Sequence, residues 1–214
     1  MTRPSLPEDV AATLRPVTLA TGRRLPLGEP WDAFVPGGAL RRGCTVAVQA
    51  PPGWGGLSLA LSLVSEASAR GHWVGVVGVD APGVVAIADL GLDLGRVLFV
   101  PRPRGAWAEA AADLLDGVDL LVVRPPGRAS LLAARRLTDR ARERSTVLVA
   151  LGEAHRSWPL PTDLSFVVTG ARWHTSSRLD ERYLDVRVLG RGAAQRGVDH
   201  VVVLPNHQGR AAAG

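Results

Sequence analysis

The sequence predicts an α/β fold: a mostly parallel, twisted sheet with helices on both faces and an antiparallel hairpin at its C-terminal edge. Between residues 44 and 151, short apolar runs alternate with amphipathic runs of helical length. The short runs are apolar throughout, which is typical of parallel strands buried on both faces, and the alternation favours βαβ units. With 214 residues and a hydrophobic content of 46%, the chain is long enough to bury one substantial core.

The chain before this alternation is expected to form a helix and an extended lead-in. Ser5 is placed to begin a short helix over residues 5–15. Residues 16–30 contain proline and glycine at intervals that favour extended chain, and residues 31–43 lead up to the first strand. Residues 1–43 are therefore interpreted as a lead-in to the core.

The core, residues 44–190, is predicted element by element. Short apolar runs are assigned to strands, and longer runs with a 3.6-residue period are assigned to helices. In chain order these are a strand at 44–50, a helix at 57–70, a strand at 72–79, a helix at 83–91, a strand at 96–100, a helix at 105–116, a strand at 119–123, a helix at 128–143 and a strand at 146–151.

The pattern changes after the last of these strands. Residues 164–169 indicate one more strand, and residues 182–189 and 199–204 alternate apolar with polar side chains, which predicts a hairpin at the sheet edge. Residues 205–214 are small and polar and are expected to be a disordered tail. The segment 191–214 is therefore predicted to contribute an edge strand and a tail.

The first strand and helix enclose a loop that resembles a phosphate-binding P-loop. On the template G-x-x-x-x-G-K-[ST], Ala50 and Gly55 take the two glycine positions. Gly56 takes the place of the lysine, and Leu57 takes the place of the hydroxyl that binds magnesium. The degenerate loop consists of Ala50, Gly53, Trp54, Gly55, Gly56 and Leu57. Its glycines permit a tight turn between strand and helix, and the helix N-terminus still favours an anion.

The charged residues and the cysteine content argue against an ATPase, a disulfide-bonded protein and a metal-binding protein. The chain has a net charge of +5, and all 25 of its lysine and arginine residues are arginine. A GC-rich genome accounts for a low lysine content, but a selected ATPase would keep one lysine. The single cysteine and five scattered histidines predict neither a disulfide framework nor a metal site. Without a signal core or an 18-residue apolar run, the chain is expected to be soluble and cytoplasmic, with no membrane partner.

The order of these motifs resembles the RecA recombinase core over residues 35–190. The resemblance rests on the sequence Gly-Gly-Ala-Leu-Arg-Arg-Gly ending at residue 43, the strand, loop and helix that follow, the sequence Arg-Gly before the second strand, and the strand at 119–123. In that family the last of these strands carries the Walker B acid. The resemblance implies a RecA-like P-loop NTPase core.

The family's catalytic positions hold different residues in this chain. The glutamate that activates water corresponds to Pro82, and the Walker B aspartate corresponds to Arg124. The glutamine that senses the γ-phosphate falls near Gly152 or Glu153. Phosphoryl transfer depends on positioning and on charge stabilisation by lysine, Mg²⁺ and a water-orienting group. The chain is therefore expected to be no enzyme, with no catalytic residue, metal or cofactor.

Arginine-rich stretches are candidates for an interaction surface, although each also has a structural interpretation. The arginines of the helix at 128–143 form either a solvated face or a surface for a partner or nucleic acid. The proline-flanked Arg102 and Arg104 belong to a structural loop or a contact surface. Trp158 and Trp173 flank a segment too short for the second DNA-binding loop of RecA, so filament-type DNA binding is not expected. The candidate residues are Arg102, Arg104, Trp107, Arg128, Arg135, Arg136, Arg182, Arg187 and Arg191.

The dead nucleotide site and the sequence at 116–128 are similar to ImuA-type proteins of actinobacterial mutagenesis cassettes. That resemblance implies an accessory protein of DNA-damage-induced translesion synthesis, which docks a Y-family polymerase homologue (ImuB type) and, indirectly, a translesion replicative-type polymerase. It also implies nucleoid association through those partners, weak DNA contact and self-association. Residues 191–214 are the expected contact, so that their deletion abolishes partner binding and leaves the domain folded.

Two further functions remain open from the sequence. A SulA-type division inhibitor is also RecA-like and lacks ATPase chemistry. An atypical nucleotide-binding enzyme needs a phosphate-binding residue from elsewhere in the chain, for which Arg124 and Arg128 are the candidates.

Overall fold

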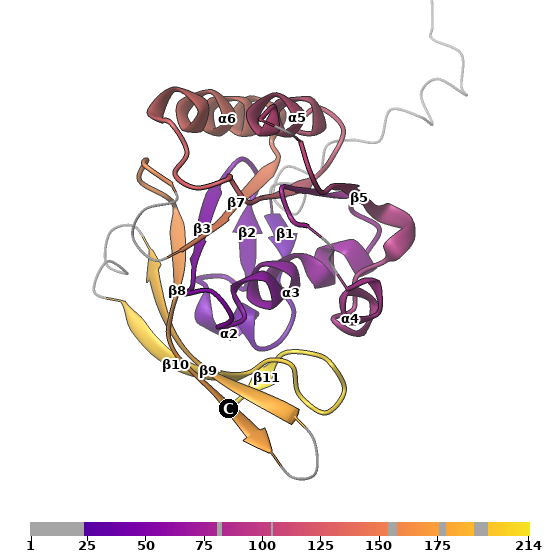
Figure 1. The fold of residues 1–214 in the computed structure, drawn as a ribbon, viewed down its shortest axis with the longest axis vertical. Helices are drawn as coiled ribbons and strands as arrows, with labels where there is room; N and C mark the ends of the chain where they lie inside the picture. Colours follow the sequence, from indigo (N-terminus) through magenta and orange to yellow (C-terminus); the bar gives the residue numbers. More distant parts are fainter. Residues whose placement is uncertain (1–23, 81–82, 104, 154–157, 176–178, 191–196) are drawn as a thin grey trace, which may run out of the picture.

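The computed structural model describes residues 24–80, 83–103, 105–153, 158–175, 179–190 and 197–214, which form an α/β domain around a nine-stranded sheet (Figure 1). The strand order is β11-β10-β9-β8-β3-β7-β6-β4-β5, and a separate two-stranded sheet pairs β1 with β2. The strands that run parallel are β3 (Thr45–Gln49), β4 (Val74–Val77), β5 (Val97–Val100), β6 (Leu120–Val123), β7 (Val147–Gly152) and, beside β3, β8 (Leu164–Thr175).

Helices cover both faces of this parallel region (Figure 1). One face carries α5 (Trp107–Leu114) and α6 (Leu131–Arg144), and the other carries α3 (Gly56–Ala69) and α4 (Val84–Asp89). A single turn of 3₁₀ helix, Leu94–Arg96, precedes β5. The fold class, the element order and the parallel sheet predicted from the periodicity are confirmed, with element ends shifted by a few residues.

The hydrophobic core forms two clusters, one on each face of the sheet. The larger contains α3 and includes Leu59, Leu63 and Phe166, which are fully buried. The smaller lies under α5 and α6 and includes Leu115 and Leu137. Since strand side chains alternate between the two faces, the apolar strands contribute side chains to both clusters.

The segment predicted as a lead-in is more structured than expected. Strands β1 (Arg24–Pro26) and β2 (Ala39–Arg41) pair antiparallel, and the short helix α2 (Trp31–Phe34) lies between them. The Trp31 side chain is buried and meets the Phe166 ring edge-on at 5.8 Å. The Phe34 ring also meets Trp31 edge-on at 6.0 Å, and Trp31 belongs to the main core cluster. The helix expected over 5–15 lies outside the described residues.

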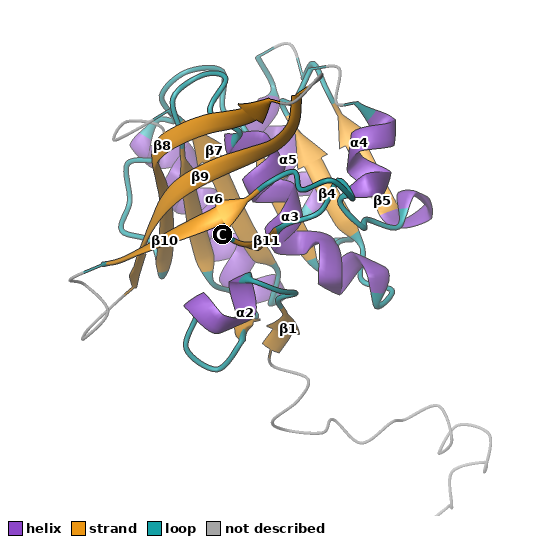
Figure 2. Ribbon diagram, turned by 90° about the horizontal axis from the view of Figure 1, so that it is seen from below, coloured by secondary structure: helices purple, strands orange, loops and turns teal. Residues whose placement is uncertain are grey.

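The C-terminal part of the sheet is antiparallel (Figure 2). It consists of β8, β9 (Leu179–Gly190), β10 (Val198–Val203) and β11 (Ala212–Ala213). The predicted antiparallel hairpin at this edge of the sheet is confirmed by the pair β9 and β10, and the two-residue strand β11 is added outside β10. Strand β9 lies between β8 and β10, and β11 is the outermost strand.

The prediction of a disordered tail over residues 205–214 is wrong, because the structure describes an ordered segment there. Ala212 pairs with Val203, and the Gly214 N–H donates a hydrogen bond to the Val201 carbonyl oxygen over 3.1 Å. Residues 202–204 are buried, so this return of the chain closes the core. Deleting residues 191–214 would remove β10 and β11 with their buried side chains, so we now expect the truncated domain to be less stable.

Candidate functional site: the loop between β3 and α3

The loop that follows β3 ends at the first turn of α3, as expected for a P-loop fold. The Trp54 N–H donates to the Pro51 carbonyl oxygen, and Gly55 is the N-cap of α3 with a φ of 84°. This left-handed conformation favours glycine because a Cβ would be strained there. No side chain caps α3. The backbone N–H groups of its first turn therefore receive no cap from a side chain at the N-cap position.

Gly56 has no space for a side chain. A Cβ at this position would stand 2.8 Å from the Ala50 Cβ and 3.3 Å from the Leu151 Cδ1. The backbone of the first turn of α3 therefore packs directly on the ends of β3 and β7. Leu57 and Trp54 are partly buried against the main core. In contrast, Gly53 has a φ of 81° and open space around it.

The loop borders a pocket of about 260 Å³. Arg124, directly after β6, lines it with an exposed side chain, and Gly152 and Glu153 line it from the end of β7. The structure thus brings together the positions that the sequence comparison placed after β6 and β7. Pro82, which corresponds to the glutamate that activates water, lies outside the described residues. Arg128 does not line the pocket.

Arg182 joins this pocket, although the sequence assigned it to an interaction surface. Its side chain is 7% exposed, and its Nε donates a hydrogen bond to the Leu204 carbonyl oxygen over 2.8 Å. Its guanidinium lies 5.2 Å from the centre of the Trp173 ring and covers Gly55, where a Cβ would stand 2.5 Å from the Arg182 Cζ. Burial lowers the pKa of Arg182 from its ordinary value.

The sequence contains a signal that would have placed Arg182 inward. In β9, Arg182 shares a face with Leu184, Val186 and Val188, which are all buried. Arg187 lies on the opposite, exposed face and forms paired hydrogen bonds of 2.7 and 2.8 Å with Asp199 on β10. Because side chains alternate between the two faces of a strand, Arg182 and Arg187 lie on opposite faces of β9.

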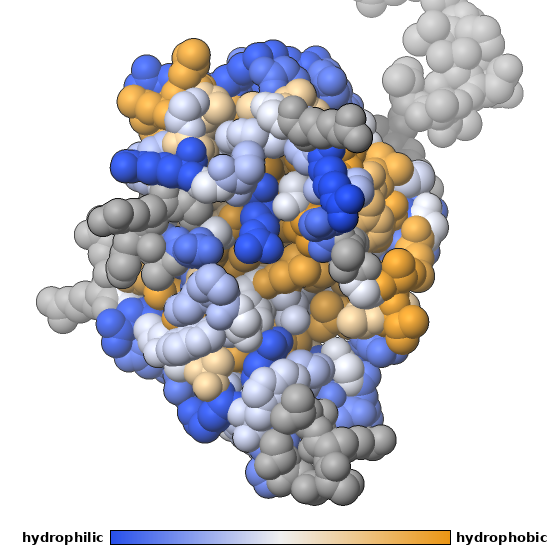
Figure 3. Space-filling model, viewed as in Figure 1, coloured by the Kyte–Doolittle hydropathy of each residue, from blue (hydrophilic) through white to orange (hydrophobic). Residues whose placement is uncertain are grey.

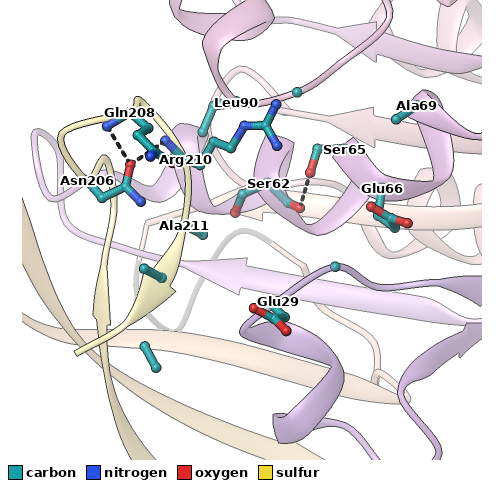
Figure 4. Close-up of a pocket in the computed structure, with 14 residues that line it drawn as sticks. Glu29, Ser62, Ser65, Glu66, Ala69, Leu90, Asn206, Gln208, Arg210 and Ala211 are labelled. Carbon is teal, nitrogen blue, oxygen red and sulfur yellow. Dashed lines mark hydrogen bonds between the residues drawn. The ribbon is translucent and has the colours of Figure 1, made fainter.

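A larger cavity of about 520 Å³ lies on the outer side of α3 (Figure 4). The C-terminal loop, with Asn206 and Gln208, faces Ser62 and Ser65 of α3 across it. Its polar groups serve the protein's own structure. Both serine hydroxyls donate to carbonyl oxygens of α3, and the Asn206 Oδ1 accepts from the backbone N–H groups of Gln208 and Arg210. The cavity therefore follows from the ordered C-terminus.

The arginines of α6 fall into two groups. Arg140 and Arg144 both pair with Asp116, and the hydrogen bond from Arg140 holds the pKa of that carboxyl below its ordinary value. By contrast, Arg135 and Arg136 are exposed, and no acidic partner is found for them among the described residues. Only the N-terminal half of α6 therefore presents unpaired positive charge.

The same half of α6 exposes two leucines that sequence reasoning missed. Leu131 is 57% exposed and Leu132 is 79% exposed. The core face of α6 is set by Ala134, Leu137 and Ala141. Leu132 lies two positions from Ala134 and so falls off that face, which is the signal that identifies it.

The remaining candidate surface residues lie in different environments. Arg102 is exposed and pairs with Asp80 over 2.8 Å. Trp107 begins α5 and packs against the smaller core cluster, so it is a core contact rather than a stacking platform. Arg128 is exposed beside the start of α6. Arg104 and Arg191 lie outside the described residues.

Solved structures confirm the architecture. The fold is similar to a KaiC-like protein, PH0186, from the archaeon Pyrococcus horikoshii, with a TM-score of 0.63 over 90% of this chain and 99% of that protein. The two sequences are 15% identical, so this likeness shows the fold alone. The core of the chain is RecA-like.

A family model for the MT3502 N-terminal domain matches residues 33–159, more than half of the chain. The chain belongs to this MT3502 family. The matched region runs from α2 through β7 and includes the loop, Arg124 and α6. It stops before β8, so the family match does not include Arg182 or the antiparallel strands.

One curated relative of this MT3502-type chain is the Mycobacterium tuberculosis protein Rv3395c. The two are 38% identical over 129 residues, which make up 56% of this chain and 63% of the relative. The chain thus spans less than two thirds of the length of that relative. None of the described helices is long and apolar enough to cross a membrane.

Proposed function

We propose that this chain is a non-catalytic RecA-like accessory protein of DNA-damage-induced translesion synthesis, which docks a Y-family polymerase homologue of the ImuB type. The observation that carries the proposal is the closed first turn of α3. Gly56 packs on Ala50 and Leu151, so the position of the P-loop lysine has no space for any side chain. A fold that keeps its architecture without this group is best explained as a scaffold.

The chemistry of the neighbouring positions supports the same reading. Leu57 has no oxygen to bind a metal ion, and Arg124 lines the pocket with a positive charge that repels one. Phosphoryl transfer draws nearly all of its acceleration from charge stabilisation and positioning. The pocket is therefore proposed to support no ATP hydrolysis.

The start of α6 is the surface that best suits docking. We call Arg128, Leu131, Leu132, Arg135 and Arg136 the α6 surface. In an α-helix, residues three and four apart lie side by side, so Leu132 adjoins both arginines of the helix. Figure 3 shows apolar side chains beside hydrophilic ones in this region of the molecule. Exposed apolar groups edged with unpaired charge are typical of interaction sites.

The chemistry of the α6 surface defines its partner. Apolar side chains on the partner would cover Leu131 and Leu132, and carboxylates would pair with the arginines around them. This surface replaces residues 191–214 as the proposed contact, because β10 and β11 are part of the sheet. Weak contact of the same arginines with DNA phosphates belongs to the proposal as a secondary interaction. Self-association also belongs to it, without an assigned surface.

Affinity capture of the tagged full chain from its own host, before and after DNA damage, tests the proposal. The wash is made at high salt, which screens exposed charge pairs and leaves apolar contacts in place. Recovery of a Y-family polymerase homologue after damage is the expected result. Recovery of the tubulin-like division protein in its place would favour a SulA-type inhibitor and contradict the proposal. Recovery of neither would also contradict it.

A further inference from the structure

The pocket beside the loop holds an arginine whose charge is poorly matched by the protein. Arg182 is 7% exposed, and the single hydrogen bond described for its side chain runs from Nε to the Leu204 carbonyl oxygen. Its Nη2 is buried without a hydrogen-bond partner. In the part of the chain that the structure describes, no carboxylate forms an ion pair with it. A buried charge in this state is costly unless something else neutralises it.

The surroundings of Arg182 also favour negative charge. Its guanidinium lies over Gly55, the N-cap of α3, whose first-turn N–H groups and helix dipole attract anions. A cation alone at this end of a helix is unfavourable, so the contact between Arg182 and α3 is repulsive as it stands. An anion in the pocket that both elements line would be attracted by the guanidinium and by the amides.

The pocket has the size and the charge for one small oxyanion. Its volume is about 260 Å³, below the range of pockets that hold drug-sized ligands. Arg124 and Arg182 line it from β6 and β9, against one carboxylate, Glu153. Two guanidiniums suit the bidentate recognition of phosphate oxygens, and they disfavour a metal ion.

We infer that this pocket binds a phosphate group without a metal ion, with Arg182 and the first-turn amides of α3 as its ligands and Arg124 at its mouth. Arg182 reaches the loop from β9, so the charge comes from a different element than the lysine of an ordinary P-loop. Binding involves no bond cleavage. The inference is independent of the docking function, and occupancy of the pocket would tie the antiparallel strands to α3.

Isothermal titration calorimetry of the full chain in the presence of EDTA tests this inference. The probes are inorganic phosphate, pyrophosphate and ADP, at ionic strength matched with chloride. Saturable binding of at least one probe is expected, and the probe that binds most tightly identifies the bearer of the phosphate group. Binding that requires added Mg²⁺, or no saturable binding of any probe, would overturn the inference.

Variants assign the binding to its residues. Arg182→Met is expected to weaken phosphate binding about tenfold or more, because it removes a charge-assisted contact. Arg187→Met on the same strand is the matched control, since Arg187 is exposed and paired with Asp199, and it should bind as the parent does. Unchanged affinity in Arg182→Met would contradict the assignment. If that variant fails to fold, the exposed Arg124→Gln variant provides the test, and it must also bind more weakly.

Discussion

The guanidinium of Arg182 lies directly on Gly55, so that a single methyl group at Gly55 would come within 2.5 Å of the Arg182 Cζ. This contact connects the first turn of α3 to β9, two elements separated by most of the chain. It places an arginine from the antiparallel half of the sheet over the N-terminus of α3. The stability of the loop and the state of the pocket therefore depend on the same side chain.

Gly55→Ala is expected to lower the free energy of unfolding more than Gly53→Ala does. Both glycines have a positive φ, which costs an alanine of the order of 1–3 kcal/mol. Only Gly55 adds the clash with Arg182, since Gly53 has open space around it. Urea denaturation of both variants measures the difference. In an Arg182→Met background the two substitutions should cost the same, and a persistent difference would show that Arg182 is not its source.

Gly56→Lys is expected to destabilise the domain and to leave ATP hydrolysis undetectable. The new Cβ would stand 2.8 Å from the Ala50 Cβ, and overpacking of this kind costs about 1–3 kcal/mol. Thermal unfolding and a phosphate-release assay check the two outcomes. Gly117→Lys, with nothing within 4 Å of its Cβ, is the control for the added charge. ATP turnover in Gly56→Lys would show that the loop still accepts its lysine.

Asp119→Asn is expected to destabilise the protein at neutral pH and to have little effect in acid. Burial alone would raise the pKa of Asp119, but hydrogen bonds from Arg42 and from the Trp73 N–H outweigh it and hold the pKa below its ordinary value. A carboxyl with a lowered pKa stabilises the fold above its unfolded pKa, and this contribution is lost as the pH falls through the folded pKa. The expected cost at neutral pH is about 1–3 kcal/mol.

The pH dependence of this cost is measured by denaturant titration of parent and variant between neutral pH and the acid range. Asp139→Asn serves as the control, because Asp139 is exposed and its oxygen lies 3.7 Å from Arg142. Such surface pairs contribute little, so its effect should be small at every pH. A difference for Asp119→Asn that does not shrink on acidification would contradict the role of its charge.

Cys44 is expected to resist alkylation until the domain opens. Burial, with a smaller contribution from the nearby Asp163 carboxylate, raises the pKa of the Cys44 thiol to about 12. The thiolate is the reactive form, so iodoacetamide at mildly alkaline pH should modify the native protein very slowly. Mass spectrometry follows the modification, and full labelling in urea provides the reference. Rapid labelling of the native protein would show that the start of β3 opens locally.

The parallel half of the sheet could be predicted because its strands and helices have distinct local patterns. Runs such as Leu120–Val123 are apolar throughout and buried in the structure, and Ser130 caps α6 through the Ala133 N–H. These signals act over a few residues. The turn from β3 into α3 at Gly55 and Gly56 likewise lies where the template placed a strand-to-helix turn.

What escaped prediction depends on contacts between distant segments. Trp31 is buried because Phe166 lies opposite it, and Ala212 is ordered because Val203 offers a free strand edge. Arg182 was assigned to the surface because it is charged, although the alternation of side chains in β9 places it on the buried face with Leu184. Nothing local to the loop indicates that an arginine more than a hundred residues later covers it.

The docking function is tested most directly by the binding isotherm of the purified Y-family polymerase homologue from the same host. The parent chain should bind it at high salt, and Leu132→Asp and Arg136→Glu should each weaken binding about tenfold or more, since both lie on the α6 surface. Arg142→Glu makes the same change of charge further along α6 and should bind as the parent does. Equal binding by all four proteins, or no binding by the parent, would contradict the docking function.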